Sequence, residues 1–212
     1  MFEINYPEEV EKISEWIKNT VKSSGFSKIV IAVSGGIDSA VSTALCVKAI
    51  GPENVFCVLL PYGKLSGEHT KDAKDILKSF QIPLENIKEI NIQEAVDSII
   101  KNISDVNEIR KGNIMARVRM IYIFDSAKKL NAIVCGTENK TEHYLGYFTR
   151  FGDEASDLEP IKKFYKTQIW EFGKILNVPE KIIAKAPTAG LWEEQTDEGE
   201  LGFTYKEADK IL

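Results

Sequence analysis

The string Ser34-Gly-Gly-Ile-Asp-Ser39 is the segment whose residue types and spacing point most directly to chemistry. Two consecutive glycines allow the backbone to take positive φ and to approach an anion closely. A helix that begins near Ser39 would direct free N–H groups and the positive end of its dipole at the same anion. The hydroxyls of Ser34 and Ser39 add two further donors. The segment therefore predicts a phosphate-binding turn.

Asp38 does not fit a simple phosphate site, because a carboxylate repels phosphates unless a divalent cation lies between them. Mg²⁺ is the hard cation that proteins bind through one or two carboxylates together with phosphate oxygens. Asp38 therefore predicts Mg²⁺ as a cofactor and ATP as a co-substrate.

The string also excludes three better-known loops. A Walker loop needs Gly-Lys-Ser/Thr, and no lysine stands here. A dinucleotide fingerprint needs Gly-x-Gly-x-x-Gly. A nucleophile elbow needs Gly-x-Ser-x-Gly, so neither serine is expected to act as a hydrolase nucleophile. The remaining structural alternative is a tight turn with a capping serine.

Short β-branched runs alternate with amphipathic stretches along most of the chain. The expected strands are Lys28–Val33, Val55–Leu60, Ile87–Ile92 and Asn131–Cys135. The expected helices are Glu8–Ser23, Ser39–Ile50, Glu68–Phe80, Gln93–Ile103, Asn107–Lys129, Asn139–Leu145 and Tyr165–Leu176. This alternation predicts an α/β fold, doubly wound and Rossmann-like, with a mostly parallel sheet and helices on both faces. Ligands in such folds lie beyond the carboxyl ends of strands, where the Ser34 turn falls.

The C-terminal third shows less regular patterning. Gly146–Lys163 and Ala189–Gly202 have no clean periodicity and are expected to be irregular. Thr204-Tyr-Lys-Glu207 spells a capping box and predicts a helix start.

The helix expected from Asn107 to Lys129 is apolar around nearly its whole circumference, which is typical of a buried helix. The apolar residues are Ile114, Met115, Val118, Met120, Ile121, Ile123 and Phe124. One domain of 212 residues would struggle to cover such a helix. A two-fold interface is the expected solution.

Composition favours a single globular domain spanning residues 1–212, with 43% hydrophobic and 28% charged residues. The net charge of -5 argues against a broad nucleic-acid footprint. No segment reaches the ~18 apolar residues of a membrane span. The N-terminus lacks the features of a signal peptide.

The cysteines Cys46, Cys57 and Cys135 lie in apolar runs and are expected to be buried. The cytoplasm is the expected compartment.

The Ser34 string resembles the pyrophosphate loop of the ATP pyrophosphatases, which cleave ATP between its α and β phosphates. NAD synthetase, GMP synthetase, asparagine synthetase and several tRNA-modifying enzymes share that loop. The later motifs resemble ammonia-dependent NAD synthetase. They are Lys111–Met120, Gly136–Glu142, Gly146–Asp153, Tyr165–Gln168, Pro187–Leu191 and Asp197–Gly202. The resemblance implies a carbon–nitrogen ligase that amidates deamido-NAD with ammonia through an adenylated intermediate. It also implies release of AMP and pyrophosphate in the last step of NAD biosynthesis, and a homodimer.

The resemblance also assigns roles to single residues. The ATP-binding residues would be Ala32, Val33, Ser34, Gly35, Gly36, Ile37, Asp38, Ser39, Thr137, Lys166 and Thr188. Asp38 and Glu142 would ligate Mg²⁺, and Asp153, Lys166 and Thr188 would be catalytic. Arg117, Arg150 and Asp157 would bind the substrate. Because Arg117 and Arg119 point to different sides of a helix, at most one readily faces the ligand, and the motif favours Arg117.

The chain departs from the family pattern in two places. Family members usually have lysine at the position of Arg150, and Gly-Asp-Gly-Gly where this chain has Gly152-Asp-Glu-Ala155. A basic C-terminal tail is expected to be absent. No glutamine amidase domain is expected either, so the ammonia would be free or would come from a separate partner.

Two rival hypotheses are another ATP pyrophosphatase, such as a tRNA-modifying enzyme, and a non-catalytic nucleotide-binding module.

Overall fold

Four parallel strands form the centre of the computed structural model, which describes residues 4–63, 67–192 and 194–212. The strands are β1 (Ile29–Ala32), β2 (Val55–Leu59), β3 (Ile87–Glu89) and β4 (Ile133–Cys135), in the order β3-β2-β1-β4. Ile29 of β1 pairs with Val55 on one side and Ile133 on the other, so β1 is central. The predicted parallel sheet is confirmed, and its switch in strand order lies beside β1.

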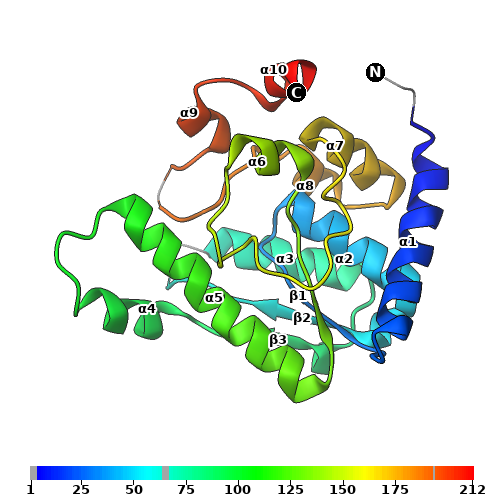
Figure 1. Ribbon diagram of the computed structural model, residues 1–212, viewed down its shortest axis with the longest axis horizontal. Helices are drawn as coiled ribbons and strands as arrows, with labels where there is room; N and C mark the ends of the chain where they lie inside the picture. The colour runs from blue at the N-terminus through cyan, green and yellow to red at the C-terminus, as the bar shows by residue number, and fades with distance from the viewer. Residues whose placement is uncertain (1–3, 64–66, 193) are drawn as a thin grey trace.

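Helices cover both faces of the sheet, as the sequence predicts (Figure 1). They are α1 (Tyr6–Ser23), α2 (Ile37–Ile50), α3 (Gly67–Ser79), α4 (Gln93–Ile100), α5 (Glu108–Leu130), α6 (Lys140–Leu145), α7 (Lys166–Ile175), α8 (Glu180–Ile183), α9 (Asp197–Leu201) and α10 (Tyr205–Ile211), with short 3₁₀ turns at Pro52–Asn54 and Leu84–Asn86. One buried cluster joins α1, α2, α3 and α7 to the sheet, and a second joins α4 and α5 to its other face.

The predicted third strand, Ile87–Ile92, is longer than β3. Beyond Glu89 the chain still hydrogen-bonds toward β2, since Ile90 N–H donates to Leu59 O and Ile92 N–H donates to Pro61 O, both at 2.9 Å. These bonds do not form a regular ladder, because Pro61 on the neighbouring segment has no N–H to donate.

The long helix α5 is not buried all round within one chain, which agrees with the expectation that a single domain would not cover it completely. Met115 and Ile123 face the core and are fully buried, whereas Ile121 is 66% and Phe124 39% exposed. The apolar residues of α5 therefore lie on two sides of the helix, one facing the core and one facing outward. The outer side remains an open apolar strip.

A helix lies inside the stretch Ala189–Gly202 that is predicted to be irregular. Helix α9 has five residues, and Thr196 caps it by accepting a hydrogen bond from Gly199 N–H. A helix this short shows no apolar periodicity, although its acidic first turn suits a helix N-terminus. The predicted capping box at Thr204 and Glu207 is confirmed at the start of α10.

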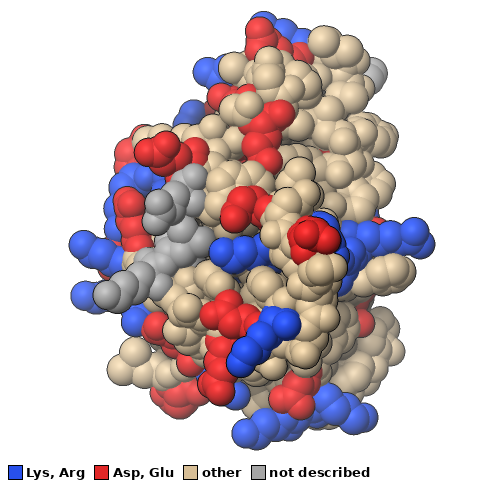
Figure 2. All heavy atoms as spheres, turned by 90° about the vertical axis from the view of Figure 1, so that its left-hand side faces the viewer, with Lys and Arg blue, Asp and Glu red and all other residues tan. Residues whose placement is uncertain are grey.

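Surface and core features agree with several expectations from composition. All three cysteines are buried and free. Among the described residues, no helix combines the length and apolar character needed to cross a membrane. On the face shown in Figure 2, basic and acidic side chains are interspersed rather than gathered into one positive field.

Candidate active site

The Ser34–Ser39 turn joins the end of β1 to the first turn of α2. Gly36 precedes the helix, and in the described part of the chain no side chain caps its first N–H groups. Gly35 has a φ of +89°, and a Cβ there would stand 2.4 Å from the backbone oxygen of His69, so only glycine fits. The hydroxyls of Ser34 and Ser39 lie 3.1 Å apart beside these N–H groups. The turn therefore has the geometry of the predicted anion site.

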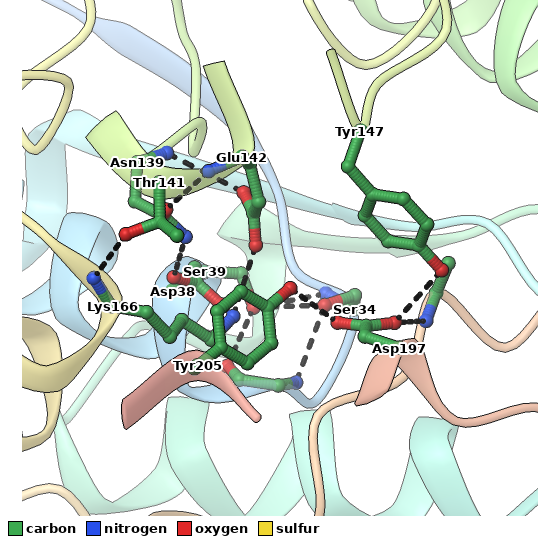
Figure 3. Close-up of polar contacts among 12 residues, drawn as sticks. Ser34, Asp38, Ser39, Asn139, Thr141, Glu142, Tyr147, Lys166, Asp197 and Tyr205 are labelled. Carbon is green, nitrogen blue, oxygen red and sulfur yellow. Dashed lines mark hydrogen bonds and ion pairs between the residues drawn. The ribbon is translucent and has the colours of Figure 1, made fainter. Parts of the chain in front are cut away.

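Lys166 forms the charged centre of the site (Figure 3). Its Nζ lies 2.5 Å from Asp38 Oδ2 and 3.0 Å from Glu142 Oε1, and the residue is only 2% exposed. Burial by itself lowers the pKa of Lys166, but the charges of Asp38 and Glu142 outweigh it and raise that pKa above its ordinary value. The side chain therefore stays protonated between two carboxylates.

Helix ends hold these three side chains in place. Asn139 caps α6 in a capping box with Glu142, and its side-chain amide also donates to Asp38 Oδ1 at 2.9 Å. Lys166 begins α7, and its backbone N–H donates to Thr141 Oγ1 at 2.9 Å. The Asn-Lys-Thr-Glu spelling at 139–142 could have predicted this cap from the sequence, but the contact to Asp38 is visible only in the fold.

A cavity of about 440 Å³ opens at the carboxyl ends of the strands. Of the predicted ATP, metal and catalytic residues, those that line it are Ala32, Val33, Ser34, Gly36, Ile37, Asp38, Ser39, Thr137, Glu142, Asp153, Lys166 and Thr188. Its apolar part is formed by side chains that include Val58, Leu60, Met120, Ile123 and Val134. The cavity thus joins an anion-binding end to an apolar end that suits an aromatic base.

The predicted substrate residues Arg117, Arg150 and Asp157 lie outside the cavity lining formed by the described residues. Arg117 Nε donates to the backbone oxygen of Arg150 at 3.1 Å. The Arg150 guanidinium lies 4.9 Å from the ring centroid of Phe151. Asp157 Oδ2 accepts a hydrogen bond from Val134 N–H at 2.7 Å, which ties its loop to β4.

Arg119 is the arginine of α5 that lines the cavity, and the sequence motif favoured its neighbour instead. Its Nε donates to the backbone oxygen of Leu60 at 3.2 Å. Burial lowers the pKa of Arg119 to about 10, and Asp153 opposes that shift, so the side chain is charged at neutral pH. The two-residue spacing does separate the two arginines onto different sides of the helix, as predicted.

Asp153 also lines the cavity, where Thr149 N–H donates to its Oδ1 at 3.0 Å. The Asp153 residue is exposed to the open cavity, yet the protein around its carboxyl group partly desolvates it and raises its pKa, while the hydrogen bonds from Thr149 act in the opposite direction. A carboxylate with a raised pKa is a better proton acceptor at neutral pH, which suits the predicted role as a base.

Three features together indicate a nucleotide-binding enzyme that handles the phosphates of ATP. They are the parallel α/β sheet, the uncapped helix start after its central strand, and the lysine held by two carboxylates. Residues 9–212 match the family model described as NAD synthase. The chain is 44% identical over 210 residues to an NH(3)-dependent NAD(+) synthetase of Fusobacterium nucleatum, covering 99% of this chain and 80% of that protein. The chain therefore belongs to the NAD synthase family, and the predicted class of carbon–nitrogen ligase is confirmed.

Solved structures agree with this assignment. The NMN synthetase of Francisella tularensis superimposes with a TM-score of 0.93 at 38% identity, covering 99% of this chain and 87% of that one. An NH3-dependent NAD synthetase of Campylobacter jejuni gives a TM-score of 0.80 at 35% identity, covering 85% of this chain and 77% of that one. The predicted Rossmann-like fold is confirmed by both.

Replacing each arginine of the α5 pair by methionine should show which one recognises the substrate. Because Arg119 lines the cavity and Arg117 does not, Arg119→Met should raise the KM for deamido-NAD by about tenfold or more, as expected for losing a hydrogen bond to a charged group. Arg117→Met should change it by less than about threefold. Steady-state kinetics of both variants measure this, and the reverse order would restore the motif-based choice of Arg117.

Glu159 stabilises a turn of the site through hydrogen bonds whose contribution depends on pH. Its carboxylate accepts hydrogen bonds from Glu138 N–H at 3.2 Å and Ser156 Oγ at 2.7 Å, so it holds the turn that carries Thr137. Burial, together with the charge of Glu138, raises the pKa of Glu159 from 4.5 to about 7. The folded protein therefore binds this proton more tightly than the unfolded chain does.

Because the folded pKa of Glu159 is raised, its contribution to stability is present below pH 4.5 and is lost as the pH rises toward 7. The difference in unfolding free energy between wild type and Glu159→Gln should shift by about 1–2 kcal/mol across this window, after a discount for partial exposure. Urea unfolding at several pH values measures it. A difference that stays constant with pH would contradict the raised pKa.

Proposed function

We propose that this chain amidates deamido-NAD to NAD with ammonia and cleaves ATP to AMP and pyrophosphate. The observation that carries the proposal is the meeting, in one cavity, of the uncapped start of α2 with the buried group Asp38, Lys166 and Glu142. Such a site binds the phosphates of ATP and stabilises the charge of a departing pyrophosphate.

In the first step the nicotinate carboxylate attacks the α-phosphorus of ATP, and the bond to the β-phosphate oxygen breaks. Pyrophosphate leaves with both electrons of that bond. The free N–H groups of α2 and the hydroxyls of Ser34 and Ser39 receive its negative charge, and the Lys166 ammonium adds a full positive charge beside them. Most of the catalysis is therefore positioning and charge stabilisation.

In the second step ammonia attacks the acyl carbon of the mixed anhydride, and AMP leaves. Ammonium must first lose a proton, and a carboxylate can accept it. Asp153 lines the cavity with a raised pKa and is the base in this proposal. Arg119 lies on the same wall and supplies a fixed positive charge for the substrate.

Asp38 and Glu142 are the residues that would hold Mg²⁺. They fit the metal because each already directs one carboxylate oxygen at a single cation, the Lys166 ammonium. Carboxylate oxygens are the hard donors that this ion prefers. When bound, Mg²⁺ would neutralise charge on the phosphates. We further propose a cytoplasmic location, which the three free, buried cysteines support.

The test combines product analysis with two isosteric variants. With Mg²⁺, ATP, deamido-NAD and ammonium, wild-type protein should release AMP, pyrophosphate and NAD in equal amounts. Asp38→Asn and Glu142→Gln, or excess EDTA, should each lower kcat at least about 100-fold, since each removes charge stabilisation of the leaving group. Asp75→Asn, a change at an exposed carboxylate of α3, should leave the rate unchanged.

The same assay separates the alternatives. Nicotinate mononucleotide is a second candidate substrate, because the Francisella structure, with a TM-score of 0.93, is that of an NMN synthetase. A kcat/KM higher for the mononucleotide than for deamido-NAD would favour that function. No AMP with either substrate would defeat the proposal, and it would leave a nucleotide-binding module or an ATP pyrophosphatase of another substrate.

We also propose a homodimer formed through the outer side of α5. Ile121 and Phe124 leave an apolar strip there, and Ile109 at the start of the same helix is 63% exposed. Exposed apolar strips of this kind mark interfaces between subunits.

Sedimentation equilibrium at micromolar concentration tests the dimer. Wild-type protein should sediment as a dimer, and Ile121→Asp should sediment as a folded monomer, because a buried unpaired charge is costly at an interface. Leu84→Asp, a matched change at another exposed apolar residue outside α5, should leave the dimer intact. A wild-type monomer would contradict the proposal.

A further inference from the structure

Asp197 is a buried carboxylate that none of the roles above uses. It is the first residue of α9, is 4% exposed, and lines the same cavity as Lys166. Figure 3 shows its side chain reaching toward Tyr147 and Tyr205, two residues from separate segments of the chain. A carboxylate this buried near a phosphate site needs a reason, because it costs free energy and repels the ligand.

Asp197 holds the backbone on both sides of Thr188. Its own N–H donates to Pro187 O at 3.0 Å. Its Oδ1 accepts a hydrogen bond from Ala189 N–H at 3.1 Å. The residues immediately before and after Thr188 are thus fixed by one residue, which leaves the Thr188 backbone little freedom.

The Thr188 hydroxyl is oriented by the same segment. Gly190 N–H donates to Thr188 Oγ1 at 3.0 Å, so one acceptor position of the hydroxyl is used. A hydroxyl has one proton to donate, and this bond leaves that proton available for an anion bound in the cavity. Gly190 has a φ of +60°, a conformation that glycine adopts without strain.

A carboxylate suits this position because all the partners of the Asp197 side chain are donors. Besides Ala189 N–H, it accepts a hydrogen bond from Tyr205 OH at 2.9 Å. Tyr147 OH lies 3.2 Å from it, but the single proton of that hydroxyl is shared with Glu200 Oε2, which is closer. An ionised carboxylate accepts hydrogen bonds and donates none, so it suits the Ala189 and Tyr205 donors. Asparagine has nearly the same shape, but its neutral amide oxygen is a weaker acceptor than a charged carboxylate. Its hold on the segment would be weaker.

We propose that Asp197 is a positioning residue that orients the Thr188 hydroxyl toward the phosphates of bound ATP. The proposal rests on the proposed function in taking ATP as the ligand, but its test measures binding and does not require turnover. It assigns the Asp197–Gly202 motif a role in building the ATP site, although Asp197 itself need not touch the nucleotide.

A double-mutant cycle tests whether Asp197 acts through Thr188. The probe is the Mg²⁺ complex of α,β-methylene-ATP, which is not cleaved between these phosphates, and its Kd is measured by calorimetry. Asp197→Asn and Thr188→Ala should each weaken binding about tenfold, the cost of a lost hydrogen bond to a charged group. The double variant should bind within about twofold of Thr188→Ala, since coupled residues are not additive. Additive losses would overturn the proposal.

Asp209→Asn is the matched control, because Asp209 is also 4% exposed and also accepts one hydroxyl and one backbone N–H. Its partners, Thr141 and Thr167, lie outside the 187–191 segment. Its effect on the Kd should therefore add to that of Thr188→Ala. If the losses in binding from Asp209→Asn and Thr188→Ala were as non-additive as those from Asp197→Asn and Thr188→Ala, the site would be loosened in general. That result would overturn the specific role of Asp197.

Hydrogen exchange at the Ala189 amide supplies a second measurement on the folded wild type. The bond to Asp197 should slow exchange at least about tenfold relative to an unstructured peptide. Asp197→Asn should reduce that protection, and Asp209→Asn should keep it. Even if Asp197→Asn does not fold, an unprotected Ala189 amide in wild type would overturn the proposal. A wild type that binds the probe but makes no NAD would contradict only the proposed function.

Discussion

The pairing of the buried Lys166 ammonium with two carboxylates is the interaction on which the site depends. A cation that is 2% exposed is tolerated only if opposite charges and hydrogen bonds replace the water it has lost. Asp38 comes from the start of α2, Glu142 from α6 and Lys166 from α7. The fold must therefore bring three helix ends together at one edge of the sheet, and each end carries a residue predicted to bind ATP or Mg²⁺.

The supporting contacts follow from the same constraint. Asn139 caps α6 and also donates to Asp38, so one amide fixes a helix start and a charged side chain. Asp209 of α10 accepts from Thr141 Oγ1 at 2.5 Å and from Thr167 N–H at 2.8 Å, which joins α6 to α7. Residues that support catalytic groups in this way leave those groups few alternative positions, which lowers the cost of organising the site when a ligand binds.

The sequence predicted best those features that depend on local chemistry. Alternating strands and helices define the sheet, and the Gly-Gly string with Asp38 defines the phosphate turn, because both rest on neighbours in the chain. The choice between Arg117 and Arg119 depends on how α5 is rotated against β1 and β4. That rotation is set by packing across the sheet and not by spacing. The same holds for the contact between Asp38 and Lys166, which are far apart in the sequence but share one cavity.

Helix α9 shows a different limit of sequence reasoning. Its five residues are too few for periodicity. It contacts the Thr188 segment through tertiary hydrogen bonds, such as the one from Ala189 N–H to Asp197. The loop at residues 152–155 shows a different limit, because there the sequence pattern suggested a change in backbone shape. Glu154 and Ala155 replace two glycines of the family pattern, yet neither takes positive φ, and Ala155 N–H closes an ordinary turn on Gly152 O at 2.9 Å. Phe151 instead takes the positive φ, at +60°. The loop therefore does not need those glycines for its backbone shape. Glu154 also adds a negative charge to the loop, which acts on Lys162.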